Sequence, residues 1–181
     1  EKEGISREDF GMDMVDRAIM RARYLRTDGG AGKLLKRMYS QMAEEQECME
    51  RVRDFFASIL KQEDGAFLWH CTSGKDRTGV TGALVLYALG ADMETIKADY
   101  LYTNEQNHTY REDLLRRMKD KGAEAELIEE MRVLESVDWS YIESFFNTLK
   151  RKYGSINHFL TDQIGLTHAK KEHFLEMFTE R

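Results

Sequence analysis

The stretch from Ala66 to Gly90, AFLWHCTSGKDRTGVTGALVLYALG, constrains the fold of this chain more than any other. A short apolar run leads into a polar segment from His70 to Arg77, and an apolar segment of helical period follows to Leu89. The order of these patterns predicts a strand, a loop and a helix. Because the first backbone amides of a helix have no intrahelical partner, such a loop is suited to bind an oxyanion.

The loop carries groups that can bind and attack a phosphoryl group. Cys71 opens it and Arg77 closes it, so the sulfur can lie beneath a bound phosphate while the guanidinium offers two donors at its rim. Gly74 lets the backbone approach the anion, and Thr78 can place a hydroxyl near the sulfur. We therefore expect Cys71 to be a thiolate at neutral pH and to form a cysteinyl-phosphate that water hydrolyses.

The segment HCTSGKDRTG, residues 70–79, resembles the signature of cysteine-dependent protein tyrosine phosphatases, in the subgroup that has Lys-Asp before the Arg. The similarity continues in DYLYTN at 99–104, in YGSINHFL at 153–160 and in IGL at 164–166, and covers most of the chain from about Met38 onward. The resemblance implies a bacterial hydrolase that acts on phosphotyrosine and, in several members, on phosphoinositides.

The expected catalytic residues are Cys71, Arg77 and Asp76. His70 is expected to support the loop through hydrogen bonds, because a thiolate that is already ionised needs no base. The expected substrate-binding residues complete the loop and the first turn of the helix: Thr72, Ser73, Gly74, Lys75, Thr78 and Gly79.

Asp76 could have either of two roles. Many tyrosine phosphatases carry their general acid, an Asp, on a separate movable loop that contains Pro, but this chain has no Pro. Asp76 is the nearest carboxyl group in the sequence, and repulsion by a dianionic phosphate would favour its protonated, donating form. Alternatively, Asp76 holds Lys75 or a neighbouring amide in place.

Lys75 adds a second cation to the loop. It would suit a substrate with more than one phosphate, such as an inositol phosphate headgroup. The alternative is a solvated lysine that raises the local potential and the association rate.

Three functions follow from the loop. The first is hydrolysis of phosphotyrosine in proteins, with phosphoserine, phosphothreonine and phosphoinositides as further candidate substrates. The second is a phosphate-binding module without turnover, against which the intact Cys71, Arg77 and Thr78 argue. The third is a phosphatase restricted to inositol phosphates.

Composition sets wider bounds. With 181 residues, of which 41% are hydrophobic, the chain suits one phosphatase domain over residues 1–181. Its net charge of −6 and the lack of a basic stripe argue against nucleic acid. Cys48 and Cys71 are no disulfide framework, and a reactive thiolate needs a reducing setting. The histidines lack metal-ligand spacing, so neither a metal nor a cofactor is expected.

No apolar run approaches the roughly 20 residues of a membrane span, and no signal peptide is visible. We therefore expect a protein without a transmembrane segment that is cytoplasmic, or secreted into a host cell by a signal that this sequence does not display.

Most of the chain has helical period. Ser6 with Asp9 predicts the start of a first helix, and Thr27 to Gly32 interrupts it. Two helices are expected next, with an interruption near Glu44 to Glu47. Their expected buried positions are Leu35, Met38 and Met42, then Met49, Val52, Phe56 and Ile59.

Two charged helices with thin apolar stripes are expected within residues 110–137. They form either a lid over the site, as the resemblance implies, or an ordinary surface hairpin. Asp92 and Asp138 are expected to cap the helices that follow them.

The expected fold class is α/β and tyrosine-phosphatase-like, with a parallel central sheet flanked by helices. This chain contributes mainly helices and the strand before the phosphate loop. Since a parallel sheet needs several strands, and in the family the N-terminal half supplies them, we expect a missing N-terminal segment or a second chain to complete the sheet.

Overall fold

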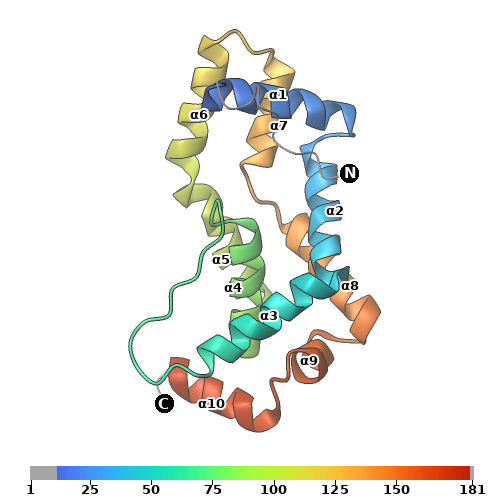
Figure 1. The fold of residues 1–181 in the computed structure, drawn as a ribbon, viewed down its shortest axis with the longest axis vertical. Coiled ribbons are helices and arrows are strands. Elements are labelled where there is room, and N and C mark those ends of the chain that lie inside the picture. The colour runs from blue at the N-terminus through green and yellow to red at the C-terminus, as the bar shows by residue number, and fades with distance from the viewer. Residues whose placement is uncertain (1–11, 180–181) are drawn as a thin grey trace. The chain divides into compact units, whose positions relative to one another are not determined.

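The computed structural model describes residues 12–179, and this part of the chain is helical without any strand (Figure 1). The expected α/β fold class is therefore wrong. The expected strand before the loop, residues 66–69, has an irregular backbone. Phe67 and Trp69 contact Phe55, with ring centroids 5.9 and 5.4 Å apart, whereas Leu68 is 88% exposed. The alternation of a strand is present, but no described segment pairs with it, and strands need hydrogen-bonded neighbours.

The expected completion of a sheet by an N-terminal segment or a second chain gains no support. Residues 12–179 contain no strand that such a piece could extend.

Most of the helices follow one another with short connections, whereas the long segment 60–75 joins α3 to α4 (Figure 1). In chain order they are α1 (Met14–Thr27), α2 (Ala31–Glu44), α3 (Gln46–Ile59), α4 (Asp76–Ala88), α5 (Met93–Gln106), α6 (His108–Asp120), α7 (Ala125–Leu134), α8 (Trp139–Tyr153), α9 (Ile156–His158), the π-helix η2 (Phe159–Gln163) and α10 (His168–Phe178). None of the described helices is long and apolar enough to cross a membrane.

Several helix starts agree with the sequence. The Asp92 carboxylate accepts a hydrogen bond from the Thr95 amide at 2.7 Å, and Asp138 accepts one from the Ser140 amide at 2.9 Å, so both predicted caps are confirmed. Helix α1 begins at Met14, where the Asp13 side chain accepts from the amides of Val15 and Asp16. The predicted caps Ser6 and Asp9 lie outside the described residues.

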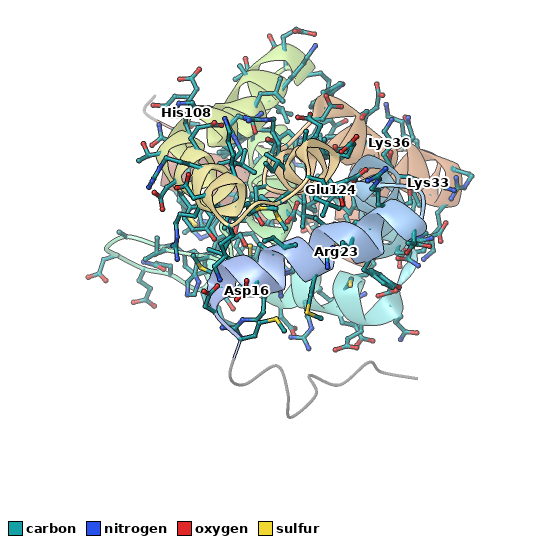
Figure 2. All side chains as sticks on the ribbon, turned by 90° about the horizontal axis from the view of Figure 1, so that it is seen from above. Asp16, Arg23, Lys33, Lys36, His108 and Glu124 are labelled. Carbon is teal, nitrogen blue, oxygen red and sulfur yellow. The ribbon has the colours of Figure 1, made fainter. Side chains whose placement is uncertain are left out.

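The chain divides into two compact units, of which the first takes in Glu1–Leu35 and Asn104–Ser136. In it α1, α6 and α7 pack against one another. Figure 2 labels Asp16 and Arg23 on α1, and Lys121 from the end of α6 forms ion pairs with Asp13 and Asp16 at 2.5 and 2.7 Å. The apolar stripes predicted within residues 110–137 are buried: Leu114, Leu115, Met118, Leu127, Met131 and Leu134. The role of these helices as a lid stays a prediction.

The second unit takes in Lys36–Thr103 and Val137–Arg181 and contains the expected phosphate loop. The face predicted for α3 is buried as expected, at Met49, Val52, Phe56 and Ile59. The face predicted for α2 is wrong at two positions, because Tyr39 and Ala43 are buried in place of the predicted Met38 and Met42. Its buried residues follow a spacing of four: Ala31, Leu35, Tyr39 and Ala43. This row brings a tyrosine, instead of Met38, into the interior.

Helix α4 lies close to α5 where Gly79 meets the ring of Tyr100. A Cβ atom at position 79 would lie 2.9 Å from two carbons of that ring, closer than side chains approach one another. Gly79 is therefore required by packing, and it sets the distance between the helix that follows the loop and its neighbour.

We expect Gly79→Ala to lower the free energy of unfolding by about 1–3 kcal/mol, because the added methyl group overpacks this contact. Gly82→Ala in the same helix is the matched control, since a Cβ there meets nothing within 4 Å. That change should raise stability by about 0.5–1 kcal/mol. Urea denaturation measures both, and equal effects of the two substitutions would contradict the packing argument.

Candidate active site

The loop that begins after Trp69 runs directly into the N-terminus of α4. Gly74 has φ of +66° with open space around a Cβ position, so it is needed for its backbone conformation and not for room. Lys75, the residue that precedes α4, makes no side-chain cap. The first amides of α4 are thus free of a competing side-chain acceptor at the cap position and can serve an anion.

Cys71 is half-buried where these amides converge. Burial of the thiol would raise its pKa, but hydrogen bonds from the Thr78 hydroxyl and from the amides of Thr78, Ser73 and Gly74 outweigh burial and lower the pKa to about 6. The buried Thr78 hydroxyl has no other partner of ordinary hydrogen-bond geometry within the described residues. We therefore take it to be available to the sulfur, which is mainly a thiolate at pH 7.

Arg77 lies on the exposed side of the same turn. Its Nη2 donates a hydrogen bond to Thr72 Oγ1 at 3.1 Å, which holds the guanidinium against the loop. The Thr81 hydroxyl, one turn further on, lies 3.0 Å from the carbonyl oxygens of Arg77 and Thr78 and reinforces the first turn. An exposed guanidinium at the rim of a loop of free amides is suited to bind two phosphate oxygens.

Asp76 and Lys75 form an ion pair at the start of α4. Lys75 Nζ lies 2.9 Å from Asp76 Oδ1, and the lysine side chain is only 5% exposed. Lys75 is therefore buried and paired instead of solvated. This ion pair is the contact that the alternative role of Asp76, holding Lys75 in place, requires. The Tyr39 hydroxyl donates to the same carboxylate oxygen at 3.0 Å.

His70 precedes the nucleophile and is exposed. Its Nδ1 lies 3.1 Å from the carbonyl oxygen of Cys71, a distance at which a protonated nitrogen donates a hydrogen bond. The structure thus brings the sequence-predicted residues of positions 70–79 together in one turn, with Gly79 committed to packing against Tyr100.

Two residues at this site were missed by the sequence reasoning. Tyr39 on α2 and Tyr100 on α5 join their hydroxyl groups at 2.7 Å beside Asp76. Tyr100 lies in the stretch 99–104 that the resemblance singled out, but it was not among the expected site residues. The signal for Tyr39 was its spacing of four from the buried Leu35, which places a polar atom in the interior.

An apolar cavity of about 110 Å³ lies against the other face of the first turns of α4. Its walls are formed mainly by Met42, Met49, Val52, Val80 and Phe145, with Arg77 and Cys48 among the remaining lining residues. Such walls offer few donors, so this cavity is not suited to bind an oxyanion. Within residues 12–179, no group of three or more His, Cys, Asp or Glu side chains could hold a metal ion.

Comparison with known proteins gives a consistent result. The model of the tyrosine phosphatase family matches residues 6–180. A protein of Cupriavidus necator named as a tyrosine-protein phosphatase is 33% identical over 128 residues, which are 69% of this chain and 46% of the relative. The triple specificity protein phosphatase PtpB of Mycobacterium tuberculosis is 33% identical over 110 residues, which are 56% of this chain and 40% of the relative. The chain thus spans less than half the length of these curated relatives.

We expect the rate of Cys71 alkylation by iodoacetamide to be half-maximal near pH 6, because the thiolate reacts and protonation below the pKa removes it. Thr78→Val should move the midpoint toward the ordinary thiol value of about 8.5. The measurement uses a Cys48→Ser background, so that only Cys71 reacts.

Thr81→Val is the matched control, because its hydroxyl lies near backbone carbonyls and not the sulfur. It should leave the midpoint unchanged. A midpoint that did not respond to Thr78→Val would show that this hydroxyl does not stabilise the thiolate.

Proposed function

The chain belongs to the tyrosine phosphatase family, and we propose that it hydrolyses phosphotyrosine in proteins through a cysteinyl-phosphate on Cys71. The observation that carries the proposal is the set of donors around this sulfur, supplied by Thr78, Ser73 and Gly74, which lowers the pKa of the thiol to about 6. A nucleophile that is ionised at neutral pH within an anion-binding loop is suited to attack phosphorus.

In the proposed first step, the Cys71 sulfur attacks phosphorus in line with the leaving oxygen. The sulfur–phosphorus bond forms as the phosphorus–oxygen bond to tyrosine breaks. Loop amides and the Arg77 guanidinium bind the other oxygens and stabilise the charge that they carry in the transition state. Water then hydrolyses the cysteinyl-phosphate, which releases phosphate and restores the thiolate. No metal or cofactor is needed for either step.

We assign the general acid to Asp76. Protonation of the leaving phenolate needs a carboxyl group close to the phosphoryl site, and Asp76 begins the helix that follows the loop. Its Oδ1 accepts hydrogen bonds from both Lys75 and Tyr39. We therefore assign the proton to Oδ2. The competing role, in which Asp76 only positions Lys75, uses the same ion pair and is separated from the first by the leaving-group experiment below.

The substrate range is proposed from the subgroup that the HCTSGKDRTG segment resembles. We include phosphoserine, phosphothreonine and phosphoinositides, in accord with a Mycobacterium tuberculosis relative whose name describes triple specificity. Lys75 is buried and paired with Asp76, so the resemblance and not this side chain supports the proposed range. A phosphate-binding module without turnover is not favoured, because the nucleophile, the arginine and the Thr78 hydroxyl are all in place.

Three predictions from the sequence complete the proposal. The chain acts as one phosphatase domain, residues 110–137 serve as a lid, and the protein works in the cytoplasm or after secretion into a host cell. The compact packing of α6 and α7 on α1 is compatible with either a lid or a surface hairpin.

We expect Cys71→Ser to abolish phosphate release from phosphotyrosyl peptides and from phosphoinositide vesicles, because serine is not ionised at neutral pH. Cys48→Ser is the matched control and should retain turnover. Phosphate release by the reduced wild-type protein is measured on both substrates, and their ratio distinguishes protein from lipid specificity. A wild type that binds phosphotyrosyl peptide without any turnover would instead establish the binding module.

We expect Asp76→Asn to lower kcat for phenyl phosphate by about 10²-fold or more, the usual contribution of a general acid. The loss for p-nitrophenyl phosphate should be much smaller, because its leaving group needs little protonation. Lys75→Met breaks the same ion pair but keeps the carboxyl group, and serves for comparison. If Asp76→Asn and Lys75→Met each lowered the rates with phenyl phosphate and with p-nitrophenyl phosphate by the same factor, Asp76 would be a structural partner of Lys75 and not the acid.

A further inference from the structure

Two side chains donate to one oxygen of Asp76, and a third contacts one of these two donors. The Tyr39 hydroxyl, from the middle of α2, donates to Asp76 Oδ1 at 3.0 Å. Lys75 Nζ donates to the same oxygen at 2.9 Å. The Tyr100 hydroxyl, from α5, lies 2.7 Å from that of Tyr39. The family signature covers Lys75 and Asp76, but it does not extend to Tyr39.

The two phenols are almost completely buried, at 0% exposure for Tyr39 and 2% for Tyr100. A phenylalanine would fill either position without a polar atom, whereas a buried hydroxyl costs free energy unless it is hydrogen-bonded. Burial, together with the neighbouring phenol and carboxylate, raises the pKa of Tyr39, and burial also raises that of Tyr100. Both groups therefore stay protonated and serve as donors.

The direction of each hydrogen bond follows from the number of protons. Asp76 Oδ1 accepts both in the carboxylate and in the acid that carries its proton on Oδ2, so the single proton of the Tyr39 hydroxyl points to Asp76. Tyr39 then has no proton left for Tyr100, and Tyr100 must donate to Tyr39. The result is a chain of donors from Tyr100 through Tyr39 to Asp76 Oδ1.

The surrounding packing makes this chain rigid. The ring of Tyr100 lies against Gly79, where a Cβ would come within 2.9 Å of it. The ring of Tyr39 contacts that of Tyr141 with 6.1 Å between centroids. Each ring therefore has a neighbour on another helix that restricts its position.

We propose that Tyr39, supported by Tyr100, is a positioning residue for the general acid: it holds Asp76 by Oδ1 and so aims Oδ2 at the leaving oxygen. This inference rests on the proposed function and on the assignment of Asp76 as the acid. During the first step, the Asp76 Oδ2 proton passes to the tyrosyl oxygen as its bond to phosphorus breaks. The resulting carboxylate keeps both of its donors on Oδ1.

The test compares wild type with Tyr39→Phe, which removes the hydroxyl and keeps the ring. We expect kcat for phenyl phosphate to fall about tenfold, since a hydrogen bond to a charged group contributes on the order of one power of ten. The KM and the rate with p-nitrophenyl phosphate should remain near wild type. Tyr100→Phe should show the same selectivity with a smaller loss, because the bond from Tyr39 to Asp76 persists.

Two further variants separate positioning from stability. Tyr102→Phe removes an exposed phenol from α5, the helix that carries Tyr100, and should change the rate with neither substrate. In an Asp76→Asn background, Tyr39→Phe should cause no additional loss with phenyl phosphate, because the residue acts only through that carboxyl group. Circular dichroism and thermal unfolding show whether each variant is folded. If Tyr39→Phe does not fold, Tyr100→Phe provides the test.

The outcomes distinguish this inference from the function on which it rests. If wild type shows no Cys71-dependent turnover, the proposed function fails and the inference fails with it. If wild type is active but Tyr39→Phe slows both substrates equally, or adds its full loss to that of Asp76→Asn, only the positioning role is overturned.

Discussion

A thiolate that is half removed from water needs donors directed at it, and the architecture around α4 is arranged to supply them. The amides of Ser73, Gly74 and Thr78 and the hydroxyl of Thr78 lower the pKa of Cys71 to about 6 against the opposing effect of burial. They can do so only because Gly74 adopts a left-handed conformation and turns the chain into the helix. The same amides that stabilise the sulfur are suited to bind the oxygens of a phosphoryl group. Nucleophile and oxyanion site are therefore one structural feature.

A second negative group, Asp76, begins the same helix, and the structure holds it by a separate set of donors. Lys75 and Tyr39 share its Oδ1, whereas none of the donors to Cys71 is used for it. The two groups are thus held by different donors, as the proposed roles of nucleophile and general acid require. The second set of donors also connects the loop before α4 to α2 and α5, so the position of the Asp76 carboxyl group depends on helices that are far from the loop in sequence. Gly79 makes that packing possible by letting Tyr100 approach α4.

The sequence predicted the helices well because their signals are local. Periodic apolar residues identified the buried face of α3, and Asp92 and Asp138 capped the helices that follow them, as expected from side chains that satisfy free amides. The face of α2 was displaced because spacings of three and four residues both fit a helix, and only contact with a neighbour selects between them. The predicted strand was wrong for a related reason. Phe67 and Trp69 do pack on one side and Leu68 does face solvent, but a strand is defined by a partner, and no described segment provides one.

The sequence by itself determined the chemistry of the turn: a cysteine, an arginine and a hydroxyl at spacings that a single loop before a helix can bring together. These residues are neighbours in the chain, so their proximity requires only local backbone geometry. The tertiary structure alone decided what surrounds Asp76. Tyr39 and Tyr100 are distant in sequence from Asp76 and from each other, and only the packing of α2 and α5 against α4 brings their hydroxyl groups within hydrogen-bond distance. The burial of Lys75 was decided in the same way, since a charged residue in a polar loop is predicted to be solvated until the helices enclose it.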